Sequence, residues 1–438
     1  MKFKLLFIIL FLSGSVFSQS EIFYVKDTSR ILTPETIKKE KFKPFKKNIL
    51  DKHSNDIYWF LIPAHKTTSE YIFKITYDRY DSAKAYQNSN QLKKLENERY
   101  LSYQFSRDYH VYIKVDPQFH TYIPVELNTV EKAYLTEKNL LLLNGFYYGF
   151  SFLIIIYNLF YYFFFKDNSF LYYSLFLFTM CFGVFTMDGM LNYYNINKNL
   201  NNCLMVSNYI LMALFSSKFA ISYLFLDNYY PKIKKYNYIA LTVIFIIAIL
   251  FLLSEDHIYL LILNLLVFLL MLAYWLFAVL LFNKNEYTKI LAFAYVIILF
   301  SGIDFFVLKF IGISIADIDP LTIKIGAFFE MIILSVAVLY RMKILKEENI
   351  HMRNEIVNYS QQLINLTLSE TQKNKYSIEE LSQRERQIFD LIILVKTNKE
   401  IANELIISVN TVKFHVKNIY EKLNIKSRRE AQNLRDSL

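Results

Sequence analysis

The most extensive pattern in the chain is a run of hydrophobic positions that begins at Asn139 and continues for about two hundred residues. Short polar segments divide this run into stretches of about twenty apolar residues, which is the length that a helix needs to cross a bilayer. The predicted spans cover residues 140–165, 170–190, 204–226, 237–254, 258–282, 289–311 and 321–341. The pattern therefore predicts a transmembrane domain of seven helices over residues 139–341.

Residues 1–18 have the pattern of a secretory signal peptide. Lys2 and Lys4 precede the apolar run Leu5–Leu12, and the small Ser18 suits cleavage after that position. The apolar run is too short to span a bilayer. We therefore expect the segment that follows to be exported.

Residues 19–138 contain short runs in which apolar and polar positions alternate with a period of two, as they do in half-buried strands. The predicted strands lie near residues 57–62, 71–77, 83–86, 109–115 and 121–127. The lysine-rich residues 19–50 are expected to be an irregular, solvated lead-in. Several short strands at this spacing predict a β-sandwich of jelly-roll type, which would form an extracytoplasmic sensor domain.

A polar segment with a helical pattern, residues 342–376, follows the last predicted span. Its apolar seam repeats at alternating spacings of four and three residues: Leu345, Asn349, Met352, Ile356, Tyr359, Leu363 and Leu366. Such heptads are typical of a coiled coil, and an Asn at an a position, as Asn349 would be, favours a parallel two-stranded arrangement. The alternative interpretation is a surface helix with a chance apolar stripe. The seam therefore predicts a coiled-coil linker and a homodimer.

The last segment, residues 377–438, is punctuated by residues that cap helices. It offers two capping boxes and two single caps: Ser382 with Glu385, Ser427 with Glu430, Asn398, and Ser408. These signals predict four short helices, over about residues 383–394, 399–405, 409–423 and 428–436.

The third of these helices has two contrasting faces. Its apolar face, which we expect to be buried, carries Val412, Val416, Ile419 and Leu423. The opposite face carries Asn410, Lys413, Phe414, Lys417 and Glu421. A short helix, a tight turn and an amphipathic helix predict a helix-turn-helix, whose second helix enters the DNA major groove. There, Lys413 and Lys417 can reach guanine edges or phosphates, and Phe414 can touch a thymine methyl group. The alternative is a solvated face on an ordinary bundle helix.

Composition and charge agree with a membrane protein. Hydrophobic residues make up 54% of the 438 residues, with 40 Phe and 35 Tyr. The net charge is +10, but in a membrane protein such an excess can reflect the positive-inside rule, so the total alone does not indicate DNA binding. Basic residues lie in the loops predicted inside, namely Lys232, Lys234, Lys235, Lys284, Lys289, Arg341, Lys343 and Lys346. The sequence therefore predicts a multi-pass membrane protein, with its N-terminal domain outside and its C-terminal domain in the cytoplasm.

Cysteine and histidine patterns give no sign of a disulfide framework or a metal site. The two cysteines, Cys181 and Cys203, fall in or near predicted spans, and no group of residues has metal-ligand spacing. We therefore expect no cofactor.

Some charged residues fall within the predicted spans, among them Lys218, Asp304, Lys309, Lys324 and Glu330. Charges in lipid are costly and are expected to face the bundle interior or an interface. Lys218 and Glu330 lie near the middle of the third and seventh spans, which makes an ion pair between them a reasonable expectation. The pair would act either as a switch that responds to a signal or as a static link between two helices.

The C-terminal segment closely resembles the LuxR-type DNA-binding domain of bacterial transcription regulators. The matching positions are Leu381, Arg384, Glu385, Asn398, Lys399, Glu400, Ile401, Ala402, Leu405, Ser408, Asn410, Thr411, Val412, Lys413, His415, Val416, Ile419, Tyr420, Lys422, Leu423, Ser427, Arg428, Glu430 and Ala431. The resemblance implies that Lys413, Phe414 and Lys417 face bases and that the last helix mediates dimerisation. Together with Lys399, Asn410 and Thr411, these are the candidate DNA-binding residues.

One departure from the family pattern concerns the residues just before the scaffold helix. The family usually has Gly there, whereas this chain has Val395, Lys396 and Thr397. The turn must then be made without a residue that freely adopts positive φ, so we expect a loss of stability but not of function.

The order of domains resembles that of bacterial seven-transmembrane receptors with diverse intracellular signalling modules. Within the N-terminal domain, residues 58–60 (YWF) and 122–125 (YIPV) resemble the extracellular sensor of such receptors, which has the fold of a carbohydrate-binding module. Its aromatic residues would either stack a sugar or fill the strand cores. The resemblance implies an unidentified small ligand, with carbohydrate as one class.

The sequence as a whole predicts a dimeric membrane receptor that is itself a transcription regulator and not an enzyme, with double-stranded DNA and the lipid bilayer as partners. A second hypothesis is a membrane sensor or scaffold whose cytoplasmic domain binds a partner protein instead of DNA. A third, a membrane enzyme or transporter, would need a polar constellation in the spans, and the charges there are scattered.

Overall fold

The computed structural model describes residues 21–433, apart from 47, 52–55, 79, 81–82, 118–121, 195 and 316–317. The predicted signal peptide, residues 1–18, lies outside the described residues. The chain divides into two compact units, Met1–Met342 and Lys343–Leu438, and each is described by itself.

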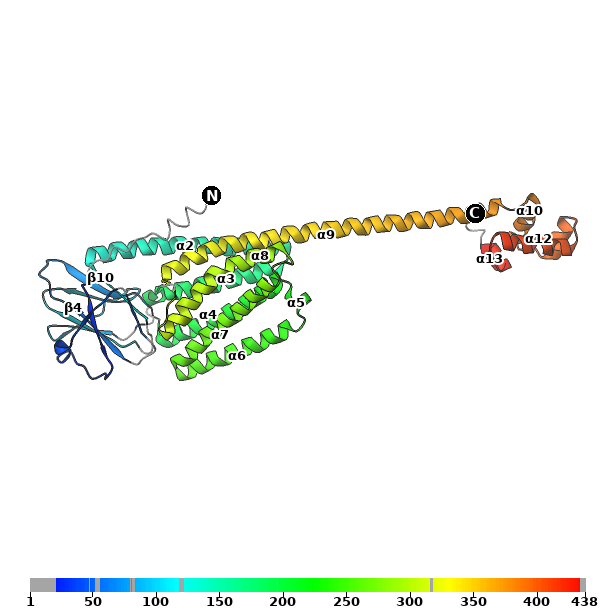
Figure 1. Cartoon of the computed structure of the whole chain (residues 1–438). Coiled ribbons are helices and arrows are strands. Elements are labelled where there is room, and N and C mark those ends of the chain that lie inside the picture. Colours follow the sequence, from blue (N-terminus) through cyan, green and yellow to red (C-terminus); the bar gives the residue numbers. More distant parts are fainter. Residues whose placement is uncertain are drawn as a thin grey trace. The chain divides into compact units, whose positions relative to one another are not determined.

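The N-terminal part of the first unit is a sandwich of two antiparallel sheets (Figure 1). One sheet has the order β2-β1-β4-β9-β6-β7, formed by β1 (Phe23–Asp27), β2 (Lys43–Pro44), β4 (Ile57–Ile62), β6 (Ala83–Gln87), β7 (Asn90–Leu92) and β9 (Val111–Val115). The other has the order β3-β10-β5-β8, formed by β3 (Asn48–Leu50), β5 (Glu70–Ile75), β8 (Leu101–Ser106) and β10 (Tyr122–Thr129). The predicted β-sandwich is therefore confirmed.

The expectation of a solvated lead-in over residues 19–50 is wrong. This segment supplies β1, which pairs with β4 in the larger sheet, and β3, which pairs with β10 in the smaller one. Between these strands, the single-turn helix η1 (Ile37–Lys39) places Ile37 in a buried cluster with Ile57 and Trp59. The alternation in this stretch is too short and too rich in lysine to stand out, and long-range pairing makes the strands.

Many aromatic residues in the described part of the sandwich fill its interior. Phe60, Phe73 and Tyr103 are buried in the core between the sheets. Trp59 points to the other side of its sheet and is fully buried there. Of the two interpretations of the aromatic residues, these positions favour the filling of the strand cores and not the stacking of a sugar.

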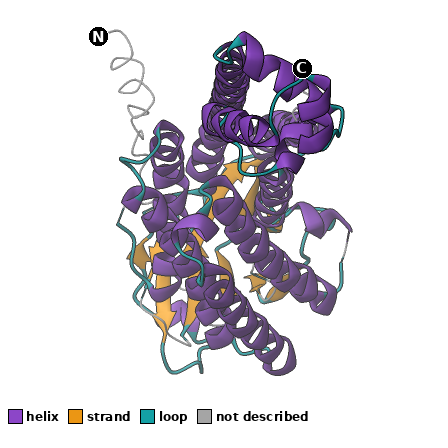
Figure 2. Cartoon of the chain, turned by 90° about the vertical axis from the view of Figure 1, so that its right-hand side faces the viewer, coloured by secondary structure: helices purple, strands orange, loops and turns teal. Residues whose placement is uncertain are grey.

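A bundle of apolar helices follows; Figure 2 shows these helices in purple, in front of the orange strands. Among the described residues, seven helices are long and apolar enough to cross a membrane, as predicted. They are α2 (Val130–Phe165), α3 (Asn168–Met187), α4 (Lys198–Tyr223), α6 (Ile233–Ser254), α7 (His257–Leu280), α8 (Glu286–Gly302) with its continuation η3 (Ile303–Leu308), and α9 (Pro320–Glu379). Short helices η2 (Met190–Tyr194), α5 (Leu226–Tyr229) and η4 (Lys309–Ile311) lie in the connections.

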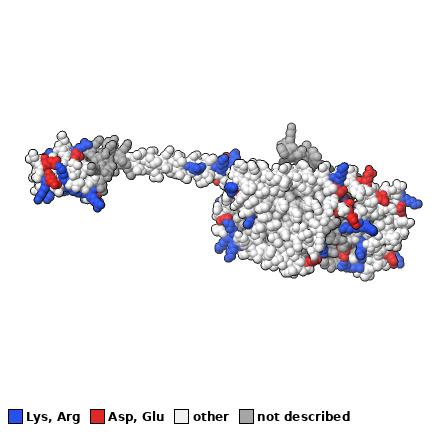
Figure 3. All heavy atoms as spheres, turned by 180° about the vertical axis from the view of Figure 1, so that it is seen from behind, with Lys and Arg blue, Asp and Glu red and all other residues white. Residues whose placement is uncertain are grey.

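Basic residues mark the end of the bundle where α9 leaves it. Exposed lysines there include Lys166, Lys232 and Lys284, and Figure 3 shows blue side chains gathered at this end, whereas the broad middle of the visible face is white. Arg341 is buried at the same end. It donates to the carbonyl oxygens of Tyr223 (2.8 Å) and Ser222 (3.0 Å) and pairs with Asp167. This guanidinium ties α9 to α4 and to the start of α3.

The expected ion pair between Lys218 and Glu330 is wrong. Lys218 lies over the ring of Tyr172, with its Nζ 5.4 Å from the ring centroid. Neither carboxylate oxygen of the buried Glu330 has a hydrogen-bond partner among the described residues. Both residues lie at mid-span by sequence, but sequence position does not fix the rotation of each helix about its axis, and rotation decides which side chains meet.

The second unit ends in a domain of four short helices: α10 (Gln383–Ile393), α11 (Asn398–Glu404), α12 (Val409–Lys422) and α13 (Arg428–Asn433). They enclose a separate core that includes Ile388, Phe389, Ile401, Val412 and Ile419. The predicted helices are confirmed to within one residue at each end, except that the predicted end of the last helix, residue 436, lies outside the described residues. The domain has its own closed core and is expected to fold as an isolated fragment.

Capping side chains begin these helices, with one difference from the prediction. Ser382 and Glu385 form a complete capping box, and Ser408 accepts from the amide of Thr411 (3.0 Å). The cap of α11, however, is Thr397 and not Asn398. Asn398 is the first helical residue, and its side chain instead accepts a hydrogen bond from Arg428 (2.9 Å). The two neighbours are both good caps, and the packing of α13 selects between them.

The helix ends in this domain are made without glycine. Val395, Ile406 and Asn424 each adopt positive φ, of 66°, 54° and 52°. After each of them, the next amide donates to the carbonyl five residues back, for example Lys396 to Leu391 (3.2 Å), which is the Schellman pattern that Gly usually completes. The turns therefore keep the usual geometry although they lack Gly. The left-handed backbone is strained at the two β-branched residues, Val395 and Ile406.

We expect Val395→Gly to stabilise the fragment 343–438 by about 1 kcal/mol. The left-handed conformation costs a non-glycine residue about 1–2 kcal/mol, and the greater freedom of Gly in the unfolded chain offsets part of the gain. Val395 is 67% exposed, so few contacts are lost. Urea unfolding measures the change. Leu394→Gly is the control: its φ is −76°, so the substitution should destabilise, and a gain there too would contradict the explanation.

Glu385 links two helices of the domain, α10 and α12. Its carboxylate accepts from Lys422 Nζ (2.7 Å) and from the amide of Ser382 (2.9 Å), while its side chain is almost fully buried. The hydrogen bond from the Lys422 ammonium, followed by those from Ser382, lowers the pKa of Glu385 to about 2. The carboxylate thus fastens the start of α10 to the end of α12.

This depressed pKa makes the stability of the domain dependent on pH. The contribution of ionised Glu385 is fully present above its ordinary value of 4.5 and is lost as the pH falls toward 2. We expect Glu385→Gln to destabilise the fragment by about 1–3 kcal/mol at pH 7 and to have little effect at pH 2. Unfolding curves across this range measure the difference. The exposed Glu421→Gln should change little at any pH, and an equal pH dependence in both variants would refute the assignment.

Candidate functional site

The candidate DNA-binding face is the exposed side of α12. Val412 and Ile419 are buried against the other helices, and this fixes the rotation of α12 so that the opposite side is free. All six predicted DNA-binding residues are exposed: Lys399, Asn410, Thr411, Lys413, Phe414 and Lys417. Phe414 is 60% exposed, although it has no charge or polar atom to favour that position. An exposed aromatic residue between two lysines fits a surface that contacts another molecule.

The N-terminal end of α12 adds to the positive character of this face. Acidic residues are absent from its first turn, and Ser408 and Thr411 share a hydrogen bond between their hydroxyl groups (2.8 Å). The free amides of the first turn carry the positive end of the helix dipole, which attracts phosphate. Lys413 lies one turn from this end. Lys417, one turn further, is 3.8 Å from Glu421, a weak exposed pair that DNA can displace.

A turn-and-helix scaffold holds α12 in place. Arg384 of α10 donates to the carbonyl oxygen of Leu405 (2.9 Å), the residue that begins the turn between α11 and α12. Lys396 and Glu404 form an ion pair that closes the other side of α11. The arrangement of α11, turn and α12 is that of a helix-turn-helix, in which the second helix can be presented to a major groove.

The predicted heptad seam lies on α9, which is one helix of 60 residues. Met352, Ile356, Tyr359, Leu363 and Leu366 are each more than half exposed in the single chain. Asn349 is exposed on the same helix. A row of exposed apolar residues on a helix surrounded by water is costly unless another surface covers it.

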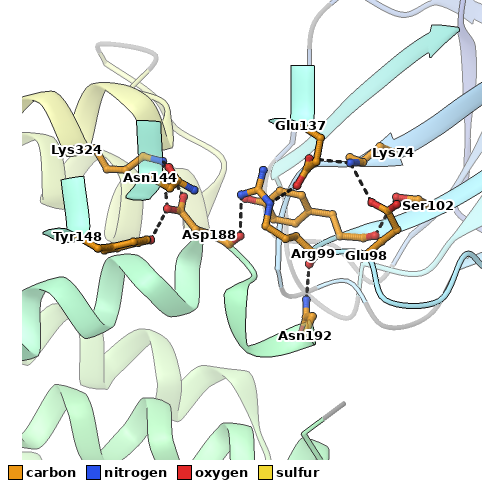
Figure 4. Close-up of polar contacts among 11 residues, drawn as sticks. Lys74, Glu98, Arg99, Ser102, Glu137, Asn144, Tyr148, Asp188, Asn192 and Lys324 are labelled. Atoms are coloured by element: carbon orange, nitrogen blue, oxygen red, sulfur yellow. Dashed lines mark hydrogen bonds and ion pairs between the residues drawn. The ribbon is translucent and has the colours of Figure 1, made fainter. Parts of the chain in front are cut away.

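A second site is a polar junction between the sandwich and the bundle (Figure 4). On the sandwich side, Arg99 is 2% exposed and donates from Nε to Glu137 of α2 (2.5 Å). Lys74 of β5 donates to the other oxygen of Glu137 (3.0 Å) and to Glu98 (3.3 Å). These contacts fix the sandwich to the first turns of α2, which continues directly from β10 at Thr129.

On the bundle side, the junction reaches α9 through Asp188. Arg99 donates to the carbonyl oxygen of Asp188 (3.0 Å), at the end of α3. The carboxylate of Asp188 accepts from Lys324 of α9 (2.9 and 3.1 Å) and from Tyr148 of α2 (2.6 Å). Lys324 also donates to Asn144 (2.7 Å). One residue, Asp188, thus connects the sandwich to α9 through its carbonyl on one side and its carboxylate on the other.

Gly189 allows the sandwich to approach this closely. Its φ is 69°, and a Cβ built on it would lie 2.4 Å from the carbonyl oxygen of Arg99. The same carbonyl accepts from Asn192 of η2 (2.6 Å). A side chain at position 189 would therefore separate the two domains where Arg99 meets Asp188.

The sequence predicts only part of this junction. Lys324 stands out as a charge within a predicted span, but its partner, Asp188, lies at the end of a predicted span and looks like an ordinary interfacial residue. Arg99 lies in a loop segment with no pattern of its own. The pair Asp188–Gly189 at a span end was the available signal, because Gly there indicates a close backbone approach.

The other charged residues in the spans serve local structure. Asp304 accepts from the amide of Ile315 (2.7 Å) and from Ser314 (3.3 Å), and so holds the loop before α9. Lys309 donates to the carbonyl oxygen of Ile318 (2.5 Å) and lies 4.3 Å from the ring centroid of Tyr122. A group of three or more residues that could hold a metal ion does not occur in the described part of the chain.

Two family models match the chain. The model described as 7TM diverse intracellular signalling matches residues 140–341, which include the bundle and the part of α9 within it. The model described as bacterial regulatory proteins, luxR family, matches residues 379–434, which include α10 to α13. Both resemblances noted in the sequence are confirmed.

Curated relatives match the C-terminal domain. The chain is 49% identical over 51 residues to the spore germination protein GerE of Bacillus subtilis (strain 168). This match covers 12% of this chain and 69% of GerE. It is 34% identical over 90 residues to the HTH-type transcriptional regulator MalT of Yersinia pestis (strain Pestoides F), which covers 20% of this chain. A MalT of Yersinia pseudotuberculosis serotype O:1b (strain IP 31758) gives the same values. The chain spans about a tenth of the length of these MalT proteins.

The match to GerE covers 69% of that protein. The 7TM diverse intracellular signalling model matches most of the bundle. The chain therefore belongs to the luxR family of bacterial regulatory proteins, and it joins that family's DNA-binding domain to a seven-helix domain of the 7TM diverse intracellular signalling type.

Proposed function

We propose that this protein is a membrane-bound transcription regulator, in which a signal received by the sandwich or the bundle controls DNA binding by α12. The observation that carries the proposal is the continuity of α9. Lys324, near its start, is held by the junction, and the same helix continues without interruption to Glu379, directly before the helix-turn-helix domain. A helix transmits rotation or displacement along its length because its backbone hydrogen bonds resist bending.

The distribution of charge supports an orientation. Lysines gather at the end of the bundle where α9 leaves it, and the positive-inside rule puts such an end in the cytoplasm. The sandwich would then lie outside the inner membrane of a bacterium. This orientation brings α12 into the compartment that holds DNA.

The exposed seam on α9 supports a homodimer. Two copies paired along this seam would bury its apolar residues, and Asn349 would pair with its symmetry mate in a parallel arrangement. Two helix-turn-helix domains related by a two-fold axis fit two near-palindromic half-sites about one helical turn apart. The names of MalT, an HTH-type transcriptional regulator, and of the luxR family agree with DNA as the partner.

The junction provides the route by which a stimulus would act. A movement of the sandwich would displace Arg99, whose guanidinium contacts both α2 and the carbonyl of Asp188. A movement of Asp188 changes its distance to Lys324 and thus the position of α9. The pair is buried, so its energy depends strongly on geometry, and a small shift favours one arrangement over another.

The first test is a DNA-binding titration of the fragment 343–438 against a genomic fragment library. We expect enrichment of a two-part sequence, and we expect Lys413→Ala or Lys417→Ala to weaken binding to it by about 1–3 kcal/mol if the lysine contacts a base. An equal loss on all sequences, with a smaller salt dependence, would indicate a phosphate contact instead. Lys346→Ala, on exposed α9, is the control and should bind as the wild type does. A folded fragment that enriches no sequence would favour a scaffold that binds a protein partner.

The second test concerns the junction. We expect Lys324→Met to destabilise the full chain in lipid nanodiscs by about 3–5 kcal/mol, because it leaves the Asp188 carboxylate buried without its cation. The double variant Lys324→Met with Asp188→Asn should recover most of this loss. The exposed Lys234→Met, which breaks only a surface pair with Asp227, should change the stability little. Thermal unfolding measures all three. Equal losses for Lys324→Met and Lys234→Met would contradict the role of the junction.

A further inference from the structure

The bundle contains a cavity of about 160 Å³ near its sandwich side. Its walls come from α3, α4, α7 and α8 with η3, and α9 contributes Ile323. A cavity of about 150 Å³ holds one benzene-sized molecule, so this space admits a ligand with a single ring or a similar volume. Cavities between the helices of a bundle are common ligand sites.

Most of the wall is apolar and adaptable. Met180 of α3, Met205 of α4 and Met271 of α7 face the cavity, together with Phe176 and Phe268. Methionine side chains are flexible and polarisable, and they adjust to ligands of different outline. The wall therefore suits an apolar body and offers no groups that would hold a highly charged ligand in its interior.

One polar side chain stands out in this wall. Asn208 of α4 lines the cavity and is only 8% exposed. Its side-chain amide can both donate and accept hydrogen bonds. The Nδ2 atom lies 3.1 Å from the position that a Cβ on Gly183 would occupy. Gly183 thus lets the amide pack against α3 in the wall of the cavity, where a ligand can pair with it.

Polar residues lie at the opening of the cavity. Lys198, at the start of α4, pairs with Glu255, after the end of α6, at 3.3 Å, and both side chains are about half exposed. Tyr77 and Asp78, which follow β5 in the sandwich, also line the cavity. Lys198 and Glu255 offset each other in this pair, so neither offers an unpaired charge to a ligand at the opening.

The π-helix η3 forms part of the wall through Phe305 and Phe306. The ring of Phe305 meets those of Tyr77 (6.3 Å between centroids) and Tyr122 (6.2 Å), which belong to the sandwich. The ring of Phe306 stacks on Phe268 at 6.0 Å. Segments of π-helix are rare and occur frequently at functional sites. Here one links the wall of the cavity to the sandwich.

The cavity also adjoins the junction. Met187 and Ile323 line it, and they directly precede Asp188 and Lys324, the two members of the buried ion pair. A molecule in the cavity would contact the residues next to both ends of this pair. Its presence would therefore favour one relative position of α3 and α9.

We propose that this cavity is the stimulus site, and that it takes a small uncharged molecule with an apolar ring-sized body and one hydrogen-bonding group, which pairs with Asn208. The assignment of a stimulus rests on the proposed regulatory function, whereas binding itself does not. The test is therefore a binding measurement without DNA, whose failure is separate from failure of the DNA titration.

The experiment measures thermal unfolding of the full chain in nanodiscs of neutral lipid at rising concentrations of phenol, with toluene as the probe of the same shape that lacks the hydroxyl group. We expect phenol to raise the midpoint in a saturable way. Toluene should bind about tenfold more weakly, the loss expected for one buried hydrogen bond. Failure of both probes to shift the wild-type midpoint would overturn the proposed ligand class.

Variants locate the binding. Gly183→Leu adds a side chain to the wall of the cavity against Asn208 and should abolish the shift, whereas Gly149→Leu on α2, where a Cβ meets nothing within 4 Å, should keep it. Asn208→Leu removes the amide and should make phenol bind no better than toluene. If Gly183→Leu does not fold, Asn208→Leu decides alone. Phenol binding unchanged in both variants would place it outside the cavity and refute the proposal.

Discussion

The buried ion pair between Asp188 and Lys324 is the interaction on which the first unit depends. Two opposite charges are held out of water, and four helical or loop segments supply their partners. Such a pair contributes little net stability relative to apolar packing, but loss of either member is costly. The pair therefore serves to position α9: it fixes the height and rotation of this helix relative to α2 and α3. The carbonyl oxygen of the same Asp188 accepts a hydrogen bond from Arg99 of the sandwich.

The opposite end of α9 within the bundle is held in a comparable way by Arg341, which binds the last turn of α4 and the first residues of α3. Between the two cations, the helix face is packed with Ala327, Met331, Leu334 and Val338. Glu330 lies on this buried stretch without a partner among the described residues. A helix fixed by polar contacts at both ends and by apolar contacts between them moves as one body, which is what signalling through it requires.

In the helix-turn-helix domain, capping residues determine where the helices begin, and the packed core determines how the helices are oriented. Capping side chains of Ser382, Thr397 and Ser408 start three helices, and Schellman turns end them, although Val395 and Ile406 are poor residues for positive φ. The hydrogen bonds of the turn and the core around Ile401 and Val412 over-determine the backbone, so it tolerates the strain. The exposed position of Phe414 is a consequence of the same core, because α12 has only one apolar face to bury.

The sequence by itself determined the order of domains, the seven spans, the four C-terminal helices and the exposed face of α12. These follow from periodicity and capping, which are local properties of the chain. Tertiary structure decided whether Thr397 or Asn398 caps α11, and it decided that β1 pairs with β4 and β3 with β10. It also decided that Lys324 meets Asp188, whereas the Glu330 carboxylate has no hydrogen-bond partner among the described residues. Each of these depends on the rotation of a helix or on pairing between distant strands, and no pattern along the chain encodes those angles.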